Sequence, residues 1–301
     1  MFIRRLPKFE YHAPTSLGEA LDQLSRHGGK AKVLAGGTDL LVSMKKREIL
    51  PEHLINLKGI EALKHIHYNK KRGLEMGALV TLAEIERLTI VREKFSALWD
   101  AVNVIAAPQI RSLATIGGNL CSAVPSADTA PPLVALGASV TLAEKNGERT
   151  LLVEDFFKGP GASVLNSDEI LRYVSIPDPP ENSGGAYLKL MRRNAMDLAL
   201  VGVAACLRLD KGKRVCKKVR IALGAVAPKP MRALKAEEVL LNKEADEHLA
   251  IEAGKVAAQE ALPISDIRAS KEYRADMVRV LTKRAVMAAL KRIRENSNHR
   301  G

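Results

Sequence analysis

The stretch Thr115–Gly137 constrains the fold and the chemistry of this chain more than any other. It runs from the β-branched pair Thr115 and Ile116 through Gly117 and Gly118 into small polar residues. Paired glycines reach backbone angles that are closed to other residues, and no Cβ hinders the approach to their amides. Successive amides in such a turn can hold an anion, above all a phosphate. A glycine pair can also mark only a tight bend, so this stretch alone leaves both interpretations open.

Polar side chains follow this turn at short intervals. Asn119, Ser122 and Ser126 add neutral hydrogen-bond donors. Asp128 can accept hydrogen bonds from a ribose or from an amide. The stretch therefore offers both donors and an acceptor to a ligand that carries phosphate and sugar.

A second glycine turn lies in Lys32–Leu41, which reads KVLAGGTDLL. A short apolar strand leads to Gly36 and Gly37, and Thr38 or Asp39 can cap the amphipathic helix that follows. The first amides and the positive dipole end of that helix would then face the turn, which suits a phosphate. Two such turns, about 80 residues apart, predict a ligand with two phosphates gripped from both sides. Neither turn matches the GxGxxG fingerprint or the P-loop lysine motif.

These stretches resemble the FAD-binding (medium) subunit of the molybdenum hydroxylases, a family that includes xanthine dehydrogenase and the molybdenum type of carbon monoxide dehydrogenase. The resemblance rests first on AGGTDLL and on QIRSLATIGGNLCSAVPSADTAPPLVALGA. It continues in YLKLMRRNAMDLALV at Tyr187–Val201 and in LPISDIRASKEYRADM at Leu262–Met277. The four motifs come in the expected order and cover nearly the whole chain.

The resemblance implies an α+β fold with two domains. A two-part FAD-binding domain of the vanillyl-alcohol-oxidase (PCMH) type is expected over residues 1–178, with subdomains of about 1–58 and 59–178. The proline-rich segment Pro177–Gly185 marks the boundary. A C-terminal domain over residues 184–295 follows, for which we expect helices and a three-stranded antiparallel sheet. The patterning predicts the three strands at Ala186–Arg193, Leu198–Leu209 and Val215–Val226.

The resemblance also implies which residues contact FAD. Lys189 matches a lysine that contacts the cofactor, and Leu198 matches the position that packs on the isoalloxazine ring. Ile105 and the pair Ile170–Leu171 match positions that line the adenine and ring ends of the pocket. We expect the binding to be non-covalent, because no histidine or cysteine motif typical of flavin attachment is present. The residues expected to bind FAD are Val33, Leu34, Ala35, Gly36, Gly37, Thr38, Asp39, Leu40, Ile105, Thr115, Ile116, Gly117, Gly118, Asn119, Ser122, Asp128, Ile170, Leu171, Lys189 and Leu198.

The resemblance further implies that the chain is one subunit of a hetero-oligomer. A large molybdopterin-binding subunit would hydroxylate the substrate, and electrons would pass through [2Fe-2S] clusters on a small iron-sulfur subunit to FAD here. NAD or another acceptor would then take them. The three cysteines Cys121, Cys206 and Cys216 form no C-x-x-C pair, so no iron-sulfur cluster is expected on this chain. We expect no catalytic acid, base or nucleophile, because a flavin carries the electrons itself.

Composition and charge exclude several other classes. The net charge of +13 is typical of proteins that bind nucleic acid. However, the basic residues are scattered and aromatic residues make up only 4%, which leaves few side chains for base stacking. No apolar run approaches the ~20 residues that span a bilayer. The N-terminus has no apolar core of a secretory signal, so we expect a cytoplasmic protein. His65 and His67 share a strand face, but no third ligand lies near them, so we expect no metal site.

Two function classes remain as alternatives. A self-contained FAD-dependent oxidase or dehydrogenase of the vanillyl-alcohol oxidase superfamily would carry a titratable base over the flavin, where this sequence has the apolar Leu198. A non-enzymatic basic binding module would purify without colour. The four motifs favour the electron-transfer subunit over both.

Overall fold

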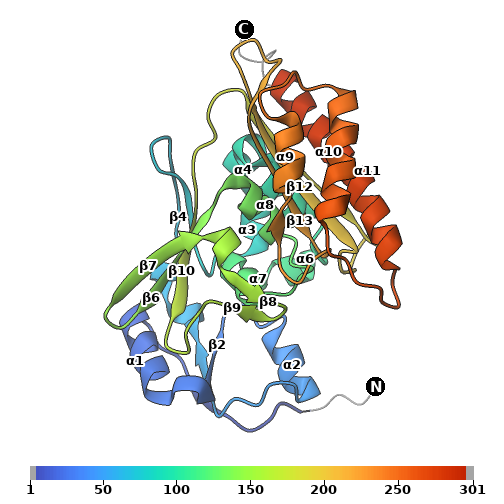
Figure 1. Cartoon of the computed structure of the whole chain (residues 1–301). Coiled ribbons are helices and arrows are strands. Elements are labelled where there is room, and N and C mark those ends of the chain that lie inside the picture. The colour runs from blue at the N-terminus through green and yellow to red at the C-terminus, as the bar shows by residue number, and fades with distance from the viewer. Residues whose placement is uncertain (1–4, 296–301) are drawn as a thin grey trace.

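A small parallel sheet begins the fold of the computed structural model, which describes residues 5–295 (Figure 1). The strand order is β1-β3-β2, and both neighbouring pairs are parallel. Parallel strands need a crossover connection, and a helix supplies each one here. The first glycine turn lies between the end of β2 and the start of α2. The elements are β1 Glu10–His12, α1 Leu17–His27, β2 Ala31–Leu34, α2 Leu40–Lys46 and β3 His53–Asn56, with short 3₁₀ turns at Gly28–Lys30, Leu57–Gly59 and Glu61–Leu63.

A five-stranded antiparallel sheet follows, in the order β4-β5-β10-β6-β7. Its strands are β4 Ile66–Asn69, β5 Gly73–Gly77, β6 Ser139–Glu144, β7 Gly147–Leu152 and β10 Ile170–Ile176, and a small pair is formed by β8 Phe157–Gly159 and β9 Ala162–Ser163. A run of short helices is inserted between β5 and β6. These are α3 Leu82–Arg87, α4 Thr89–Lys94, α5 Ser96–Asn103, α6 Pro108–Arg111, α7 Ile116–Cys121 and α8 Ala130–Leu136, and a 3₁₀ turn follows β7 at Val153–Asp155.

The C-terminal part contains a four-stranded antiparallel sheet, in the order β11-β12-β13-β14. The sheet therefore has one strand more than the three that the sequence predicted. The added strand β14 has only two residues and pairs with Leu223 and Ala222 of β13, and such a short segment leaves no alternating pattern to recognise. The elements are β11 Ser183–Leu190, β12 Val201–Leu209, β13 Cys216–Gly224, β14 Met231–Arg232, α9 Leu234–Leu240, α10 Glu247–Glu260 and α11 Lys271–Glu295.

Strand β12 is apolar on both faces because both faces are covered. Val203, Ala205 and Leu207 belong to one hydrophobic core together with residues of α10 and α11. Ala204, between them, points to the opposite face and joins the core of the middle part of the chain, where α5 and α8 pack on the sheet. Successive side chains of a strand alternate in this way. The sheet is thus sandwiched between the C-terminal helices and the inserted helices, as Figure 1 shows.

Helix α11 is fastened at its start by a buried arginine. Arg274 is 1% exposed, and its guanidinium donates to the carbonyl oxygen of Leu200 at 2.7 Å and to the carboxylate of Asp266 at 2.9 Å. Burial of a guanidinium is tolerated when its donors meet oxygen acceptors, as both terminal nitrogens do here. Among residues 5–295, no helix is both long enough and apolar enough to cross a membrane.

Candidate functional site

The two glycine turns lie against each other. A Cβ on Gly36 would stand 2.1 Å from the carbonyl oxygen of Leu113, so only glycine permits this approach. The hydroxyl of Ser122, just after α7, donates to the carboxylate of Asp39 at 2.7 Å and lies 2.9 Å from the carbonyl oxygen of Gly118. Segments that are far apart in the sequence thus meet at one place.

The first turn carries open backbone donors. Within residues 5–295, the amides of Gly36, Gly37, Thr38 and Asp39 donate no hydrogen bond. Gly37 has φ +83°, in the left-handed region that favours glycine. Asp39 occupies the N-cap position of α2, but its side chain makes no capping bond, because its carboxylate accepts from Ser122 instead. The turn therefore presents a row of amides to a ligand rather than a capped helix end.

The second turn differs from the prediction. The amides expected to be bare at Gly117 and Gly118 are both engaged: the first donates to the carbonyl of Ala78, and the second donates to the hydroxyl of Thr115, the N-cap of α7. Neither glycine has a left-handed backbone conformation. Gly117 is needed for packing, since a Cβ there would lie 2.6 Å from the Cβ of Ala78. This segment can therefore offer side chains, but not these two amides, to a phosphate.

The structure indicates the orientation of one side chain near the second turn, Asn119, and the protonation of another, Cys121. The hydroxyl of Thr129 donates to the side-chain oxygen of Asn119, which fixes the orientation of that amide group. The backbone amide of Asn119 donates to the carbonyl of Thr115. In the part of the chain that the structure describes, the side-chain nitrogen Nδ2 of Asn119 has no acceptor, so it can donate to a ligand. Burial raises the pKa of the Cys121 thiol to about 12, so this cysteine is an inert neighbour of the turn.

Asp128 lies in a buried cluster with two residues of β11. Its carboxylate accepts from the hydroxyl of Tyr187 at 2.7 Å and from the ammonium of Lys189 at 2.9 Å. The side chains of Lys189 and Asp128 are 1% and 8% exposed. Burial raises the pKa of Asp128, against the opposing effects of Lys189 and Tyr187. Burial and the neighbouring carboxylate also raise the pKa of Tyr187 well above its usual value.

Tyr187 is a residue that the sequence analysis missed. It stands two positions before Lys189 on one strand, so the two side chains point to the same face. That spacing was a signal for a shared partner. Lys189 also donates to the carbonyl oxygen of Val104 at 3.3 Å, directly before the expected site residue Ile105. The ammonium group therefore contacts protein oxygens on both sides.

Leu198 lies in a loop, residues 191–200, and not on the predicted strand, which begins only at Val201. The cause is Asp197, whose carboxylate accepts from the amides of Arg192 and Arg193 and folds the chain back. Burial opposes ionisation of Asp197, but these amide bonds lower its pKa. The amide of Met196 donates to the carbonyl oxygen of Ala106, between α5 and α6, and so ties the loop to the inserted segment. Leu198 itself is 57% exposed.

The expected apolar site residues are mostly part of the cores. Ile105 and Leu171 belong to the core around the inserted helices, at 7% and 3% exposure. Ile170 packs in another core, together with Val33 and Ala35. These residues can meet a ligand only along the edge that remains exposed or through their backbone.

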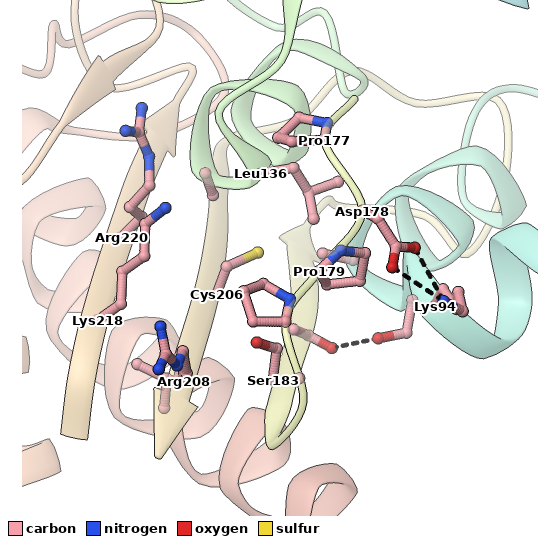
Figure 2. A pocket seen from close by; sticks show the side chains of 17 residues that line it. Lys94, Leu136, Pro177, Asp178, Pro179, Ser183, Cys206, Arg208, Lys218 and Arg220 are labelled. Carbon is pink, nitrogen blue, oxygen red and sulfur yellow. Dashed lines mark hydrogen bonds and ion pairs between the residues drawn. The ribbon is translucent and has the colours of Figure 1, made fainter. Parts of the chain in front are cut away.

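A separate cavity of about 200 Å³ lies at the junction of α5, α8 and the C-terminal sheet (Figure 2). Arg208, Lys218 and Arg220 line one side of it, and on another side Lys94 binds Asp178 at 2.8 Å. None of the expected site residues lines this cavity. The place where the glycine turns meet is therefore a different site.

Comparison with known protein families agrees with this arrangement of two parts. Residues 7–179 match the family model described as the FAD binding domain in molybdopterin dehydrogenase. Residues 186–289 match the model described as the CO dehydrogenase flavoprotein C-terminal domain. The two matches together cover most of the chain.

Individual relatives agree with the family models. The chain is 33% identical over 281 residues to the xanthine dehydrogenase FAD-binding subunit of Escherichia coli O157:H7, which covers 93% of this chain and 95% of the relative. It is 34% identical to the carbon monoxide dehydrogenase medium chain of Hydrogenophaga pseudoflava, over 94% and 97% of the two chains. A solved structure of carbon monoxide dehydrogenase from the same organism superposes with a TM-score of 0.91 at 35% identity, over 96% and 99% of the chains. These findings favour the subunit over a self-contained oxidase. The chain therefore belongs to the family of FAD-binding subunits of the molybdenum hydroxylases, which are oxidoreductases.

Proposed function

We propose that FAD binds non-covalently where the two glycine turns meet, with its diphosphate at the amides of Gly36, Gly37, Thr38 and Asp39. The observation that carries this proposal is the row of four amides that have no acceptor within the described chain. Consecutive free amides in a glycine turn form a concavity that suits phosphate oxygens. The glycines also keep the backbone accessible to a large anion.

The second turn contributes side chains to the same site. Asn119 donates through its free side-chain nitrogen, and Ser122 holds the Asp39 carboxylate so that it does not turn toward the phosphates. Thr115 and Gly118 shape the start of α7. The packing of Gly36 on Leu113 supports this arrangement, because it brings the first turn close to the residues that precede the second.

Lys189 acts as a positioning residue in this proposal. Its ammonium bridges Asp128 and the carbonyl of Val104, and this bridge fixes the segment at Ile105 relative to β11. The exposed side chain of Leu198 then covers the flavin ring from the loop that follows β11. Ile170 and Leu171 complete the apolar wall.

The resulting function is electron transfer within a larger enzyme. Bound FAD supplies a carrier that can accept and release electrons, and the residues of this chain bind and orient it. We propose that the partners are a large molybdopterin-binding subunit and a small subunit with [2Fe-2S] clusters, that NAD is an acceptor, and that the complex is cytoplasmic. The medium-chain names of the relatives support the partners. The three cysteines support them too, because Cys121, Cys206 and Cys216 lie on separate elements and are unpaired.

The domain boundaries belong to the same proposal. We assign residues 1–178 to the FAD-binding domain, with subdomains of about 1–58 and 59–178, and residues 184–295 to the C-terminal domain. The gap between the two family matches, from residue 179 to residue 186, supports the boundary.

The test begins with the flavin of the purified protein. The chain should be yellow, and acid precipitation should release intact FAD into the supernatant. Flavin that stays with the precipitate would contradict non-covalent binding, and recovery of FMN would contradict a diphosphate site. In the same preparation, hydroxylation of aldehydes or purines should require the large and small subunits; turnover by the isolated chain would contradict the assignment as a subunit.

A further inference from the structure

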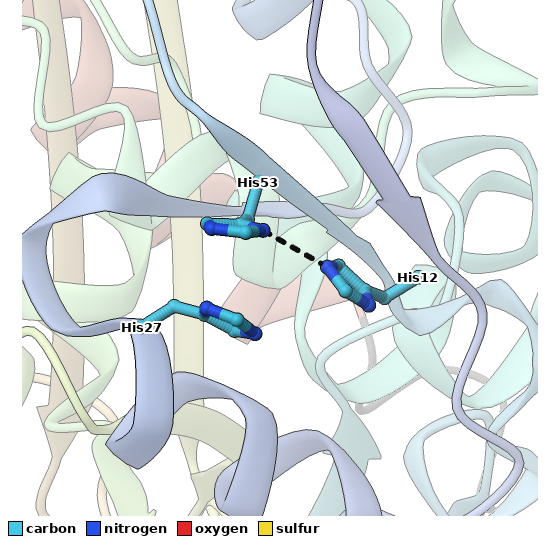
Figure 3. A group of neighbouring side chains, drawn as sticks. All are labelled: His12, His27 and His53. Carbon is cyan, nitrogen blue, oxygen red and sulfur yellow. Dashed lines mark hydrogen bonds between the residues drawn. The ribbon is translucent and has the colours of Figure 1, made fainter.

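Three histidines from separate elements gather beside the N-terminal parallel sheet (Figure 3). His12 ends β1, His27 ends α1 and His53 begins β3. One ring nitrogen of each lies within 4.8 Å of those of the other two. All three side chains are partly buried. The sequence analysis missed this group because the three positions are spread along the chain, without the close spacing of a metal motif.

Hydrogen bonds within the protein do not satisfy this group. His53 Nδ1 lies 3.1 Å from His12 Nε2 and also 3.1 Å from the carboxylate of Glu10. A ring nitrogen carries either one proton or one lone pair in the ring plane, so it cannot serve both neighbours fully. The rings of His27 and His53 stack with their centroids 3.6 Å apart. Three close imidazoles therefore share very few internal partners.

The chemistry of the group suits a metal ion. A neutral imidazole carries a lone pair on one ring nitrogen, and that lone pair can bind a metal. The three rings come from β1, α1 and β3 and bring one nitrogen each to the same place.

We propose that His12, His27 and His53 form a binding site for one divalent transition-metal cation, with the carboxylate of Glu10 or a water as the fourth ligand. In a tetrahedral zinc site with Zn–N bonds of 2.0–2.1 Å, neighbouring ligand nitrogens are about 3.4 Å apart. The 3.1 Å between His12 Nε2 and His53 Nδ1 is close to this spacing. The ring nitrogen of His27 lies within 4.8 Å of both, so metal binding requires this ring to turn out of its stack on His53. Imidazole ligands suit zinc, copper and nickel.

A cation at this place would fasten the N-terminal sheet. Strand β1 has only three residues, and among the strands of residues 5–295 it pairs only with β3, where His53 stands opposite both Glu10 and Ala31. The ion would join β1, β3 and the end of α1 at one point. We therefore assign the site a structural role, independent of flavin binding.

The chain offers a matched control histidine. Both ring nitrogens of His65 face an oxygen acceptor, with the carboxylate of Glu75 2.8 Å from Nε2 and the carbonyl oxygen of Ala62 3.0 Å from Nδ1. Its ring is engaged, and it belongs to no group of three possible ligands among the described residues. A His65→Gln substitution thus removes an imidazole without touching the proposed site.

The test uses the full chain without an affinity tag, stripped with EDTA and titrated calorimetrically with Zn²⁺ at pH 7.5. We expect one equivalent to bind, and we expect His12→Gln, His27→Gln or His53→Gln each to weaken binding by at least about tenfold, since even substitutions that only support a ligand have effects of that size. His65→Gln should bind as the unsubstituted chain does. The affinity should fall between pH 7.5 and pH 6, because protons compete for the rings.

A second readout guards against variants that fold poorly. Zn²⁺ should raise the melting temperature of the unsubstituted chain and of His65→Gln, but not that of His27→Gln. The flavin content should be the same in all these proteins. The proposal is overturned if the unsubstituted chain takes up no Zn²⁺, or if the triple variant of His12, His27 and His53 binds it equally well.

Discussion

The buried pair of Lys189 and Asp128 gives the sharpest test of how the two domains are joined. In Lys189→Met the apolar stem remains and the ammonium is lost, so Asp128 keeps only the hydroxyl of Tyr187 as a partner. Both charged side chains are almost fully buried. Breaking such a pair from one side costs roughly 3–5 kcal/mol of folding free energy, because a buried charge is left unpaired.

The pH dependence follows from the pKa of Asp128. Burial already raises this pKa above 3.8 in the intact protein, and Lys189 is the largest opposing influence. The substitution therefore raises it further. A group whose folded-state pKa is raised stabilises the protein fully below its unfolded pKa, and that stability is lost as the pH rises through the folded value. The deficit of Lys189→Met should thus be smaller at pH 5 than at pH 8.

The assay is urea unfolding followed by the fluorescence of the single tryptophan, Trp99, on α5 next to β11. The double variant with Asp128→Asn should recover most of the loss, since no buried charge remains. Lys158→Met removes an exposed lysine of β8 and should change stability by less than about 0.5 kcal/mol. A deficit below about 1 kcal/mol, or one that is equal at pH 5 and pH 8, would refute the reasoning.

Two further predictions concern the glycine turn and the thiols. Gly37→Ala should lose flavin, because the left-handed backbone costs an alanine about 1–2 kcal/mol. The control Gly147→Ala, in the β6–β7 hairpin, should keep its flavin. The measurement is the flavin absorbance per chain, and full flavin in Gly37→Ala would contradict a role of this turn in binding. Burial raises the pKa of Cys121 and Cys206 to about 12 and that of Cys216 to about 11, so the native chain at pH 8 should resist iodoacetamide and react only after unfolding. Rapid alkylation of the native chain would contradict this.

Local signals were the ones that the sequence predicted well. The sequence Thr81-x-x-Glu84 has the pattern of a capping box, and both of its hydrogen bonds form within one turn at the start of α3. The first glycine turn lies between a strand and a helix, as its neighbours predict. The family and its cofactor followed from motifs, which are local in the same sense.

What the sequence did not predict depends partly on distant partners and partly on side-chain bonds to the backbone. The amide of Gly117 is taken by the carbonyl of Ala78, which lies in another segment. The strand expected from Leu198 starts later because Asp197 gathers amides around itself. Tyr187 meets Asp128 across 59 positions of sequence; its spacing from Lys189 indicates a shared partner but does not identify Asp128 as that partner. The outcomes at Gly117 and Tyr187 are decided by tertiary contacts, whereas the loop at Asp197 is decided by local side-chain bonds to the backbone that compete with the strand.

Strand β12 has a consequence for how this protein can be divided. Because Ala204 belongs to one hydrophobic core and Ala205 to the other, this one strand contributes side chains to both cores. Cutting the chain between the two family matches would expose one apolar face of β12 to water on the C-terminal fragment. On the N-terminal fragment it would expose the apolar side chains of the inserted helices that pack on this strand. The two modules match separate family models, yet each has a complete hydrophobic core only when the other is present. Exchange of modules between relatives would therefore succeed only where both sides of this strand are exchanged together.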